Sequence, residues 1–298
     1  MKIISGSSSN ILADTIARQL DIPLSSVEIF VFPDGERRVR IEEEIIDQDV
    51  VIVQSTATPV DQNYMELFFL LDSAKRSGAK NLTVVMPYLG YQRQDHVFRD
   101  GEAVSIQVII KLLESLSVDR VIAYDLHTIR IPELFSIPVT HLSALSLFAQ
   151  KIRDNHWMAD TVLVTPDMGG IRRIEILSGL LDSMPWVSIE KNRDLATGSI
   201  ESHLLHGEIK RRAIIVDDMI SSGNTIVKAA ELLQENGAQE IYVFATHPVF
   251  SQSAPQLLQD SIVDKVFVTD TVDVPLNKRF PKLHMLSVGE EIAKEIKN

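Results

Sequence analysis

Two adjacent carboxylates, Asp217 and Asp218, follow a short apolar run in the stretch AIIVDDMISSGNTI, residues 213–226. Adjacent carboxylates at the end of a strand repel each other unless a cation or a set of hydroxyl groups shares them. Two neighbouring sugar hydroxyls, as in a ribose diol, fit this pair either directly or through a magnesium ion, which prefers oxygen ligands. The pair therefore indicates a site for a hydroxylated ligand.

The loop after the acid pair consists of small polar residues, Ser221, Ser222, Gly223, Asn224 and Thr225, and leads into a helix-like run. Small side chains allow a ligand to approach the backbone, and the N–H groups at a helix start attract anions. The loop is thus a candidate phosphate site. The alternative is an ordinary N-cap turn, in which Ser and Thr hydroxyls satisfy the helix.

The segment FPDGE, residues 32–36, combines an aromatic ring with two acids at a turn. Phe32 can stack on a base, while Asp34 and Glu36 can accept hydrogen bonds from its amino group or fix the loop around Gly35. From its residues alone, the segment is better explained as a plain turn between two strands.

A second polar segment, YQRQDH at residues 91–96, supplies Arg93 and Gln94. Arg93 can pair with a phosphate, and Gln94 can hydrogen-bond a phosphate or a base edge. A surface loop with solvated charges explains the same residues equally well.

Two single residues at the ends of apolar runs are candidates for metal binding. His127 follows VIAYD, and Asp167 ends TVLVTPD before a pair of glycines. A lone His in this position is more often a structural hydrogen-bonding group than a metal ligand. The carboxylate oxygens of Asp167 are better suited to a hard cation.

Two cations, Lys191 and Arg193, lie in WVSIEKNRDLATGSI, just before the turn-rich residues ATGS. A solvated basic loop is the commoner explanation of such a pair. A site for a phosphorylated ligand would also need cations of this kind.

The elements that position these residues are short runs rich in β-branched residues, alternating with helix-like patterns. The helix-like patterns lie at residues 61–78, 102–116 and 225–237. Most of the runs are continuously apolar, as expected for strands buried on both faces of a parallel sheet. This alternation predicts an α/β fold. The runs are KIIS, VEIFVF, DVVIVQS, LTVVMP, RVIAYD, TVLVTPD, WVSIEK, AIIVDD, IYVFATH and KVFVTD.

A weak internal repeat divides the chain. SAKRSGAKNLTVVMPY resembles ELLQENGAQEIYVFATHP, with Gly78 and Gly237 at matching places as expected helix C-caps. Upstream, VVIVQSTATP occupies the place that AIIVDDMISSGNT has in the second copy. The repeat predicts two similar domains, residues 1–142 and 143–298, each with a mostly parallel sheet flanked by helices. Only the second copy has the acid pair and the glycine loop.

The composition excludes several classes of protein. The chain has no cysteine, which excludes disulfides, thiolate metal sites and a cysteine nucleophile. Its net charge of −12 argues against a nucleic-acid partner, which needs a basic face. It contains no apolar run near about 18 residues and no signal-like start, so we expect no membrane partner and a cytoplasmic location.

These stretches together resemble a known family. IIVDDMISSGNT is similar to the ribose-phosphate binding motif of the phosphoribosyltransferase-type fold. FPDGE, YQRQDH, AYDLHT and TPDMGG appear in the order found in ribose-phosphate pyrophosphokinases, and the opening ISGSSSN is also similar. The resemblance spans nearly the whole chain. It implies a reaction of ATP with ribose 5-phosphate that gives phosphoribosyl pyrophosphate and AMP.

The resemblance also implies a role for each candidate residue. In the family, the FPDGE segment reaches the ATP site of a neighbouring subunit, which implies a homo-oligomer with shared sites. The mobile catalytic loop of the family begins with a Lys and has an Arg two positions later. The implied assignments are ATP binding by Phe32, Asp34, Gly35, Glu36, Arg93 and Gln94; ribose 5-phosphate binding by Arg193, Asp217, Asp218, Ser221, Ser222, Gly223, Asn224 and Thr225; catalysis by Lys191 and Arg193; and Mg²⁺ binding by His127 and Asp167.

The chain departs from the family pattern at His96, at Asn192 and in TIRIPELF, residues 128–135. Two other functions remain open. An ordinary phosphoribosyltransferase is disfavoured by the paired halves and by FPDGE. A non-catalytic regulatory relative that only binds nucleotides is disfavoured by Lys191 and Arg193, since such a protein could lose its catalytic loop.

Overall fold

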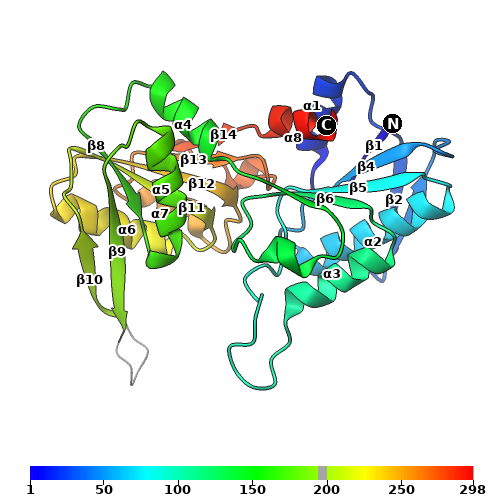
Figure 1. Ribbon diagram of the computed structural model, residues 1–298, viewed down its shortest axis with the longest axis horizontal. Helices are drawn as coiled ribbons and strands as arrows, with labels where there is room; N and C mark the ends of the chain where they lie inside the picture. Colours follow the sequence, from blue (N-terminus) through cyan, green and yellow to red (C-terminus); the bar gives the residue numbers. More distant parts are fainter. Residues whose placement is uncertain (194–199, 298) are drawn as a thin grey trace. The chain divides into compact units, whose positions relative to one another are not determined.

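A computed structural model describes residues 1–193 and 200–297 of the chain, with side chains described for 1–190 and 204–297 (Figure 1). The chain divides into two compact units. Unit 1 contains Met1–Leu142, Thr271–Asp273 and Ser287–Asn298, and unit 2 contains Ser143–Asp270 and Val274–Leu286. The last two segments of unit 1 belong to the part of the chain that the sequence analysis placed in the C-terminal domain.

Unit 1 is built on a five-stranded sheet in the order β1-β4-β5-β6-β7, in which all neighbouring strands are parallel. Helices α2 and α3 pack their leucines and isoleucines against β4, β5 and β6. Helices α1 and α8 contact each other, so the C-terminal helix packs beside the N-terminal one. The elements are β1 (Lys2–Ser5), α1 (Asn10–Leu20), β2 (Val27–Val31), β3 (Arg37–Ile41), β4 (Asp49–Val53), α2 (Val60–Arg76), β5 (Asn81–Met86), α3 (Ser105–Ser115), β6 (Arg120–Tyr124), η1 (Ile131–Leu134), β7 (Val139–Leu142) and α8 (Gly289–Lys297).

Strands β2 and β3 form a separate antiparallel hairpin, whose tip is the FPDGE segment. The sequence analysis expected the β2 run but not β3, whose sequence RRVRI alternates arginine with apolar residues. Val39 is half-buried against the core and Ile41 is buried, while Arg38 and Arg40 are exposed. This is the alternation of a strand with one buried face.

Unit 2 is built on a seven-stranded sheet in the order β10-β9-β8-β11-β12-β13-β14, parallel except for the β9–β10 pair. Helices α6 and α7 contribute to its core. The elements are α4 (Leu145–Asp154), β8 (Thr161–Thr165), η2 (Met168–Gly170), α5 (Ile171–Leu180), β9 (Trp186–Arg193), β10 (Ile200–His206), β11 (Arg212–Ile220), α6 (Asn224–Glu235), β12 (Glu240–Pro248), α7 (Ala254–Asp260), β13 (Lys265–Thr269), η3 (Leu276–Lys278) and β14 (Leu283–Leu286).

The continuously apolar strands are buried on both faces, as the sequence predicted. Val50 and Ile52 of β4 pack with α2 and α3, and the alternate residues Val51 and Val53 are buried as well. Both faces of a parallel sheet are normally covered by its crossover connections. The predicted α/β fold class, with two units that are each built on a mostly parallel sheet flanked by helices, is confirmed.

The internal repeat corresponds to equivalent parts of the two units. In unit 1, β4, α2 and β5 form a parallel strand–helix–strand unit, and in unit 2, β11, α6 and β12 do the same. Gly78 and Gly237 both follow their helix ends with positive φ, 85° and 102°. This left-handed conformation is the one that favours glycine after a helix C-cap.

In the part of the chain that the structure describes, no helix is long and apolar enough to cross a membrane.

Candidate functional site

The acid pair of unit 2 lies near the carboxyl end of β11, between β8 and β12. From β8 the chain crosses through α5 to β9 on one side, and from β11 it crosses through α6 to β12 on the other. The connections that follow β8 and β11 therefore lead to opposite sides of the sheet, and they diverge between these two neighbouring strands. In open α/β sheets, ligands bind outside the carboxyl ends of the strands at such a point.

Arg173 on α5 provides the cation that the adjacent carboxylates require. Its Nη1 lies 3.3 Å from Asp217 Oδ1, and its Nη2 lies 3.6 Å from Asp218 Oδ1. The side chains are 18%, 17% and 7% exposed for Arg173, Asp217 and Asp218. Burial and the neighbouring Asp218 charge nevertheless raise the pKa of Asp217 well above its usual value, although Arg173 opposes them. Arg173 thus offsets part of the negative charge of the pair.

The turn after β8 places Arg173 in this position. Asp167 caps the short η2 helix, its Oδ1 accepting from Gly169 N–H at 3.0 Å, and Thr165 Oγ1 donates to the Asp167 carbonyl oxygen at 2.9 Å. A Cβ on Gly170 would lie 2.2 Å from Thr165 Oγ1, so this position requires glycine. The tight turn leads directly into α5, whose third residue is Arg173.

The small-residue loop closes the same edge of the sheet. Gly223, with φ of 80°, is the N-cap residue of α6, so no Ser or Thr occupies the N-cap position of the alternative interpretation. Ser221 Oγ lies 3.1 Å from Ser251 Oγ, and Asn224 Nδ2 donates to Ser222 Oγ at 3.2 Å. Asn224 and Thr225 are exposed in the first turn of the helix. The helix start therefore presents N–H groups and a hydroxyl to solvent, an arrangement suited to an anion.

In unit 1, the FPDGE segment forms a tight turn that is hydrogen-bonded within itself. The N–H of Phe32 donates to the Glu36 carbonyl oxygen at 2.8 Å, and the N–H of Glu36 donates to Asp34 Oδ1 at 3.1 Å. Gly35 has φ of 94°, which suits glycine. The Phe32 ring is 38% exposed and meets the edge of Phe30 at 4.9 Å between centroids. An exposed ring on a rigid turn can stack on a planar ligand.

The segments that carry Arg93, Gln94 and His127 follow the neighbouring strands β5 and β6, and hydrogen bonds tie them together. Gln92 Oε1 accepts from His127 N–H at 2.8 Å, and Thr128 Oγ1 donates to Asp95 Oδ2 at 3.0 Å. Arg93 and His127 are exposed. The structure thus brings these predicted site residues to one edge of the unit 1 sheet.

Asp95 and Gln92 are residues that sequence reasoning missed. Burial acts to raise the pKa of Asp95, but hydrogen bonds from His96 and Thr128 outweigh it and lower that pKa. Gln92 is almost completely buried, unlike its exposed neighbour Arg93. Both lie within YQRQDH, so a search for what fixes the candidate ligands Arg93 and Gln94 could have found them.

The remaining predicted residues are Lys191, Arg193, His127 and Asp167. The backbones of Lys191 and Arg193 lie in β9, paired with His203 and Ile200 of β10, and their side chains lie outside the described residues. His127 belongs to unit 1 and Asp167 to unit 2. Among the described residues, no group of three or more His, Cys, Asp or Glu side chains could hold a metal ion.

Comparisons with known proteins identify close relatives. A family model described as the N-terminal domain of ribose phosphate pyrophosphokinase matches residues 1–116, and one described as a phosphoribosyl synthetase-associated domain matches residues 204–298. The ribose-phosphate pyrophosphokinase of Gloeobacter violaceus is 38% identical over 99% of this chain and 89% of its own length. That of Fusobacterium nucleatum is 38% identical over 99% of this chain and 94% of its own length.

A solved structure agrees with these relatives. The crystal structure of phosphoribosylpyrophosphate synthetase from Mycobacterium smegmatis matches with a TM-score of 0.93 and 34% identity. The match covers 99% of this chain and 97% of that chain. The likeness therefore includes both units.

Proposed function

The chain belongs to the ribose-phosphate pyrophosphokinase family, and from this premise we propose that it makes phosphoribosyl pyrophosphate for nucleotide biosynthesis. The 1-hydroxyl oxygen of ribose 5-phosphate attacks the β-phosphorus of ATP. The bond from that phosphorus to the α,β-bridging oxygen breaks, AMP leaves with the oxygen, and the hydroxyl proton is released. The proposal includes a cytoplasmic location.

The observation that carries the proposal is the acid pair of β11 with Arg173 beside it and the loop of α6 after it. Asp217 and Asp218 accept hydrogen bonds from the ribose hydroxyls, and Arg173 keeps the two carboxylates in place. The loop from Ser221 to Thr225 takes the 5-phosphate at the start of α6, where N–H groups and the helix dipole favour an anion.

The nucleotide is assigned to unit 1. Phe32 stacks on the base, with Asp34, Gly35 and Glu36 shaping the turn, and Arg93 and Gln94 bind the phosphates or the base edge. The turn lies at the tip of a hairpin outside the main sheet, a place from which it can reach a second subunit. We therefore include in the proposal a homo-oligomer with shared ATP sites.

Mg²⁺ is the proposed cofactor, and His127 and Asp167 are its candidate ligands. Magnesium is usually bound through one or two carboxylates, several waters and substrate phosphates, rather than by a complete protein cage. Waters and substrate phosphates would complete the coordination beside one carboxylate and one imidazole. When bound, the ion supplies positive charge to the phosphate oxygens.

Lys191 and Arg193 are proposed to act on the transition state. Negative charge moves toward the departing AMP oxygen as the reaction proceeds. Cations that meet this charge stabilise the transition state more than the bound substrates. Arg193 also contributes to binding of ribose 5-phosphate.

The test is an assay for AMP formation from ATP. The proposal expects AMP and phosphoribosyl pyrophosphate in equal amounts, with formation dependent on both ribose 5-phosphate and magnesium. An ordinary phosphoribosyltransferase would consume phosphoribosyl pyrophosphate and release pyrophosphate instead. A regulatory relative would bind nucleotide without turnover. Either result would overturn the proposal.

A further inference from the structure

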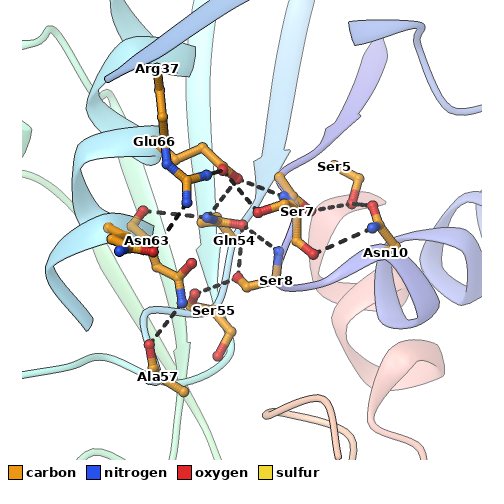
Figure 2. A network of polar contacts seen from close by, with 12 residues as sticks. Ser5, Ser7, Ser8, Asn10, Arg37, Gln54, Ser55, Ala57, Asn63 and Glu66 are labelled. Carbon is orange, nitrogen blue, oxygen red and sulfur yellow. Dashed lines mark hydrogen bonds and ion pairs between the residues drawn. The ribbon is translucent and has the colours of Figure 1, made fainter. Parts of the chain in front are cut away.

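A buried carboxylate in unit 1 collects hydrogen bonds from three separate segments (Figure 2). Glu66 on α2 has a completely buried side chain. Its oxygens accept from Ser7 N–H at 2.7 Å, Ser7 Oγ at 2.8 Å and Gln54 Nε2 at 3.0 Å, and they pair with the guanidinium of Arg37. The segment after β1, the end of β4 and the start of β3 therefore meet on this one side chain.

Arg37 connects this network to the hairpin. It is the residue directly after the Phe32–Glu36 turn, its side chain is 17% exposed, and its Nη2 donates to Gln62 Oε1 of α2 at 3.3 Å. The guanidinium thus holds two residues of α2 that lie one helical turn apart. A planar guanidinium suits such a fork of acceptors, whereas a lysine ammonium offers only a point charge.

The hairpin needs an attachment of this kind. β2 and β3 form a two-stranded sheet of their own, and an isolated two-stranded hairpin is marginally stable at best. Near its base, Val27 and Val39 pack on the core. Toward its tip, Phe30, Val31 and Phe32 are exposed, so apolar packing does not fix that end.

We infer that the Arg37–Glu66 pair is a positioning device that fixes the Phe32–Glu36 turn relative to the carboxyl edge of the unit 1 sheet. The inference rests on the proposed function, in which this turn binds ATP. Gln54 extends the network to that edge, because its Oε1 also accepts from Ser8 Oγ at 2.8 Å. Arg37 and Glu66 touch no substrate in this account and act through the turn.

The first test is substrate kinetics of Arg37→Gln, with Arg40→Gln as a matched control. Arg40 lies on the same strand, is exposed and carries the same charge. Misplacing a binding group is costly, so we expect Arg37→Gln to raise the KM for ATP by about tenfold. The KM for ribose 5-phosphate and kcat stay within about twofold of wild type. Arg37→Lys recovers part of the ATP affinity, and Arg40→Gln behaves as wild type.

The second test is hydrogen exchange, which does not depend on activity. Arg37→Gln is expected to speed exchange of the amides from Phe32 to Arg38, whereas Arg40→Gln is not. If the wild-type protein makes no AMP, the proposed function fails and the exchange result still decides whether the pair fixes the turn. Unchanged exchange in Arg37→Gln would overturn the inference. So would an equal rise of both KM values in an active enzyme, because it would indicate a general structural defect.

Discussion

The ends of β4 and β11 occupy equivalent places in the two units and are used in opposite ways. After β4, Gln54, Ser55 and Thr56 are almost completely buried, and each side chain bonds to groups of its own unit. After β11, Ser221 and Ser222 are half-buried and Asn224 and Thr225 are exposed, so only Gly223 of this loop is buried. One strand end is closed by side chains of the protein, and the other is the proposed ligand site.

The difference lies in the carboxylates. Glu66 in unit 1 is surrounded by donors from four groups, including Arg37, and a Cβ on Gly6 would lie 2.1 Å from Gln54 Oε1. Asp217 in unit 2 shares one arginine with a second carboxylate, and its pKa is raised. A buried carboxylate that accepts from four donor groups is typical of a structural role, whereas a carboxyl group with a raised pKa beside a second carboxylate is typical of a functional site.

The largest effect is expected from Lys191→Ala in unit 2. If this cation meets charge that develops only in the transition state, kcat falls by ~10²–10⁴, or roughly 3–5.5 kcal/mol, with little change in either KM. Arg37→Gln in unit 1 changes ATP affinity instead. The measurement is turnover with both substrates saturating. Lys210→Ala is the control, since Lys210 pairs with the exposed Glu208. A Lys191→Ala enzyme with the wild-type rate would favour the alternative interpretation, in which Lys191 and Arg193 are solvated basic residues without a catalytic role.

A smaller effect is expected on stability in unit 1. Glu66→Gln leaves Arg37 without its carboxylate and places an amide among donors, so the free energy of unfolding falls by about 1–3 kcal/mol. Chemical denaturation measures this change. Glu28→Gln is the control, because Glu28 and Arg38 form an exposed ion pair that is expected to contribute little to stability. Equal stability of Glu66→Gln and wild type would mean that the network is not structural.

Asp217→Asn in unit 2 is expected to raise the stability of the protein, whereas Glu66→Gln lowers it. The pKa of Asp217 is raised in the folded protein. The contribution of this group to folding stability is therefore fully present below the usual aspartate pKa, where the carboxyl is neutral, and is lost as pH rises through the folded pKa. Asparagine stays neutral. The variant is therefore expected to have a higher Tm than wild type at neutral pH, with a gap that shrinks toward pH 4. A variant less stable than wild type at pH 7 contradicts the raised pKa of Asp217.

Much of the fold could be predicted from local patterns. All ten apolar runs are strands, and the helix-like patterns at 61–78, 102–116 and 225–237 correspond to α2, α3 and α6. β3 was missed because its alternation is masked by three arginines, at 37, 38 and 40. The return of α8 to unit 1 is a long-range packing preference that no local pattern encodes.

The candidate site could be proposed from the sequence where its residues are neighbours in the chain. Asp217, Asp218 and the loop after them are contiguous, so residue types alone indicated an anion and hydroxyl site. Arg173 was missed because it lies 44 positions from Asp217. Only the packing of α5 beside β8, the strand next to β11, brings the two residues together. The conformation of Gly223 likewise depends on where α6 begins.

The most direct test of the account is the affinity of ribose 5-phosphate for Thr225→Val, measured by titration calorimetry without ATP. Thr225 is exposed at the start of α6, so its loss removes a hydroxyl donor to a charged group without disturbing the core. The account predicts a loss of about 1.5–3 kcal/mol in sugar-phosphate binding, with ATP binding unchanged. Ser55→Ala, at the equivalent strand end of unit 1, is predicted to keep wild-type affinity for the sugar phosphate. Wild-type affinity in Thr225→Val would contradict the claim that the β11 end is the ligand site.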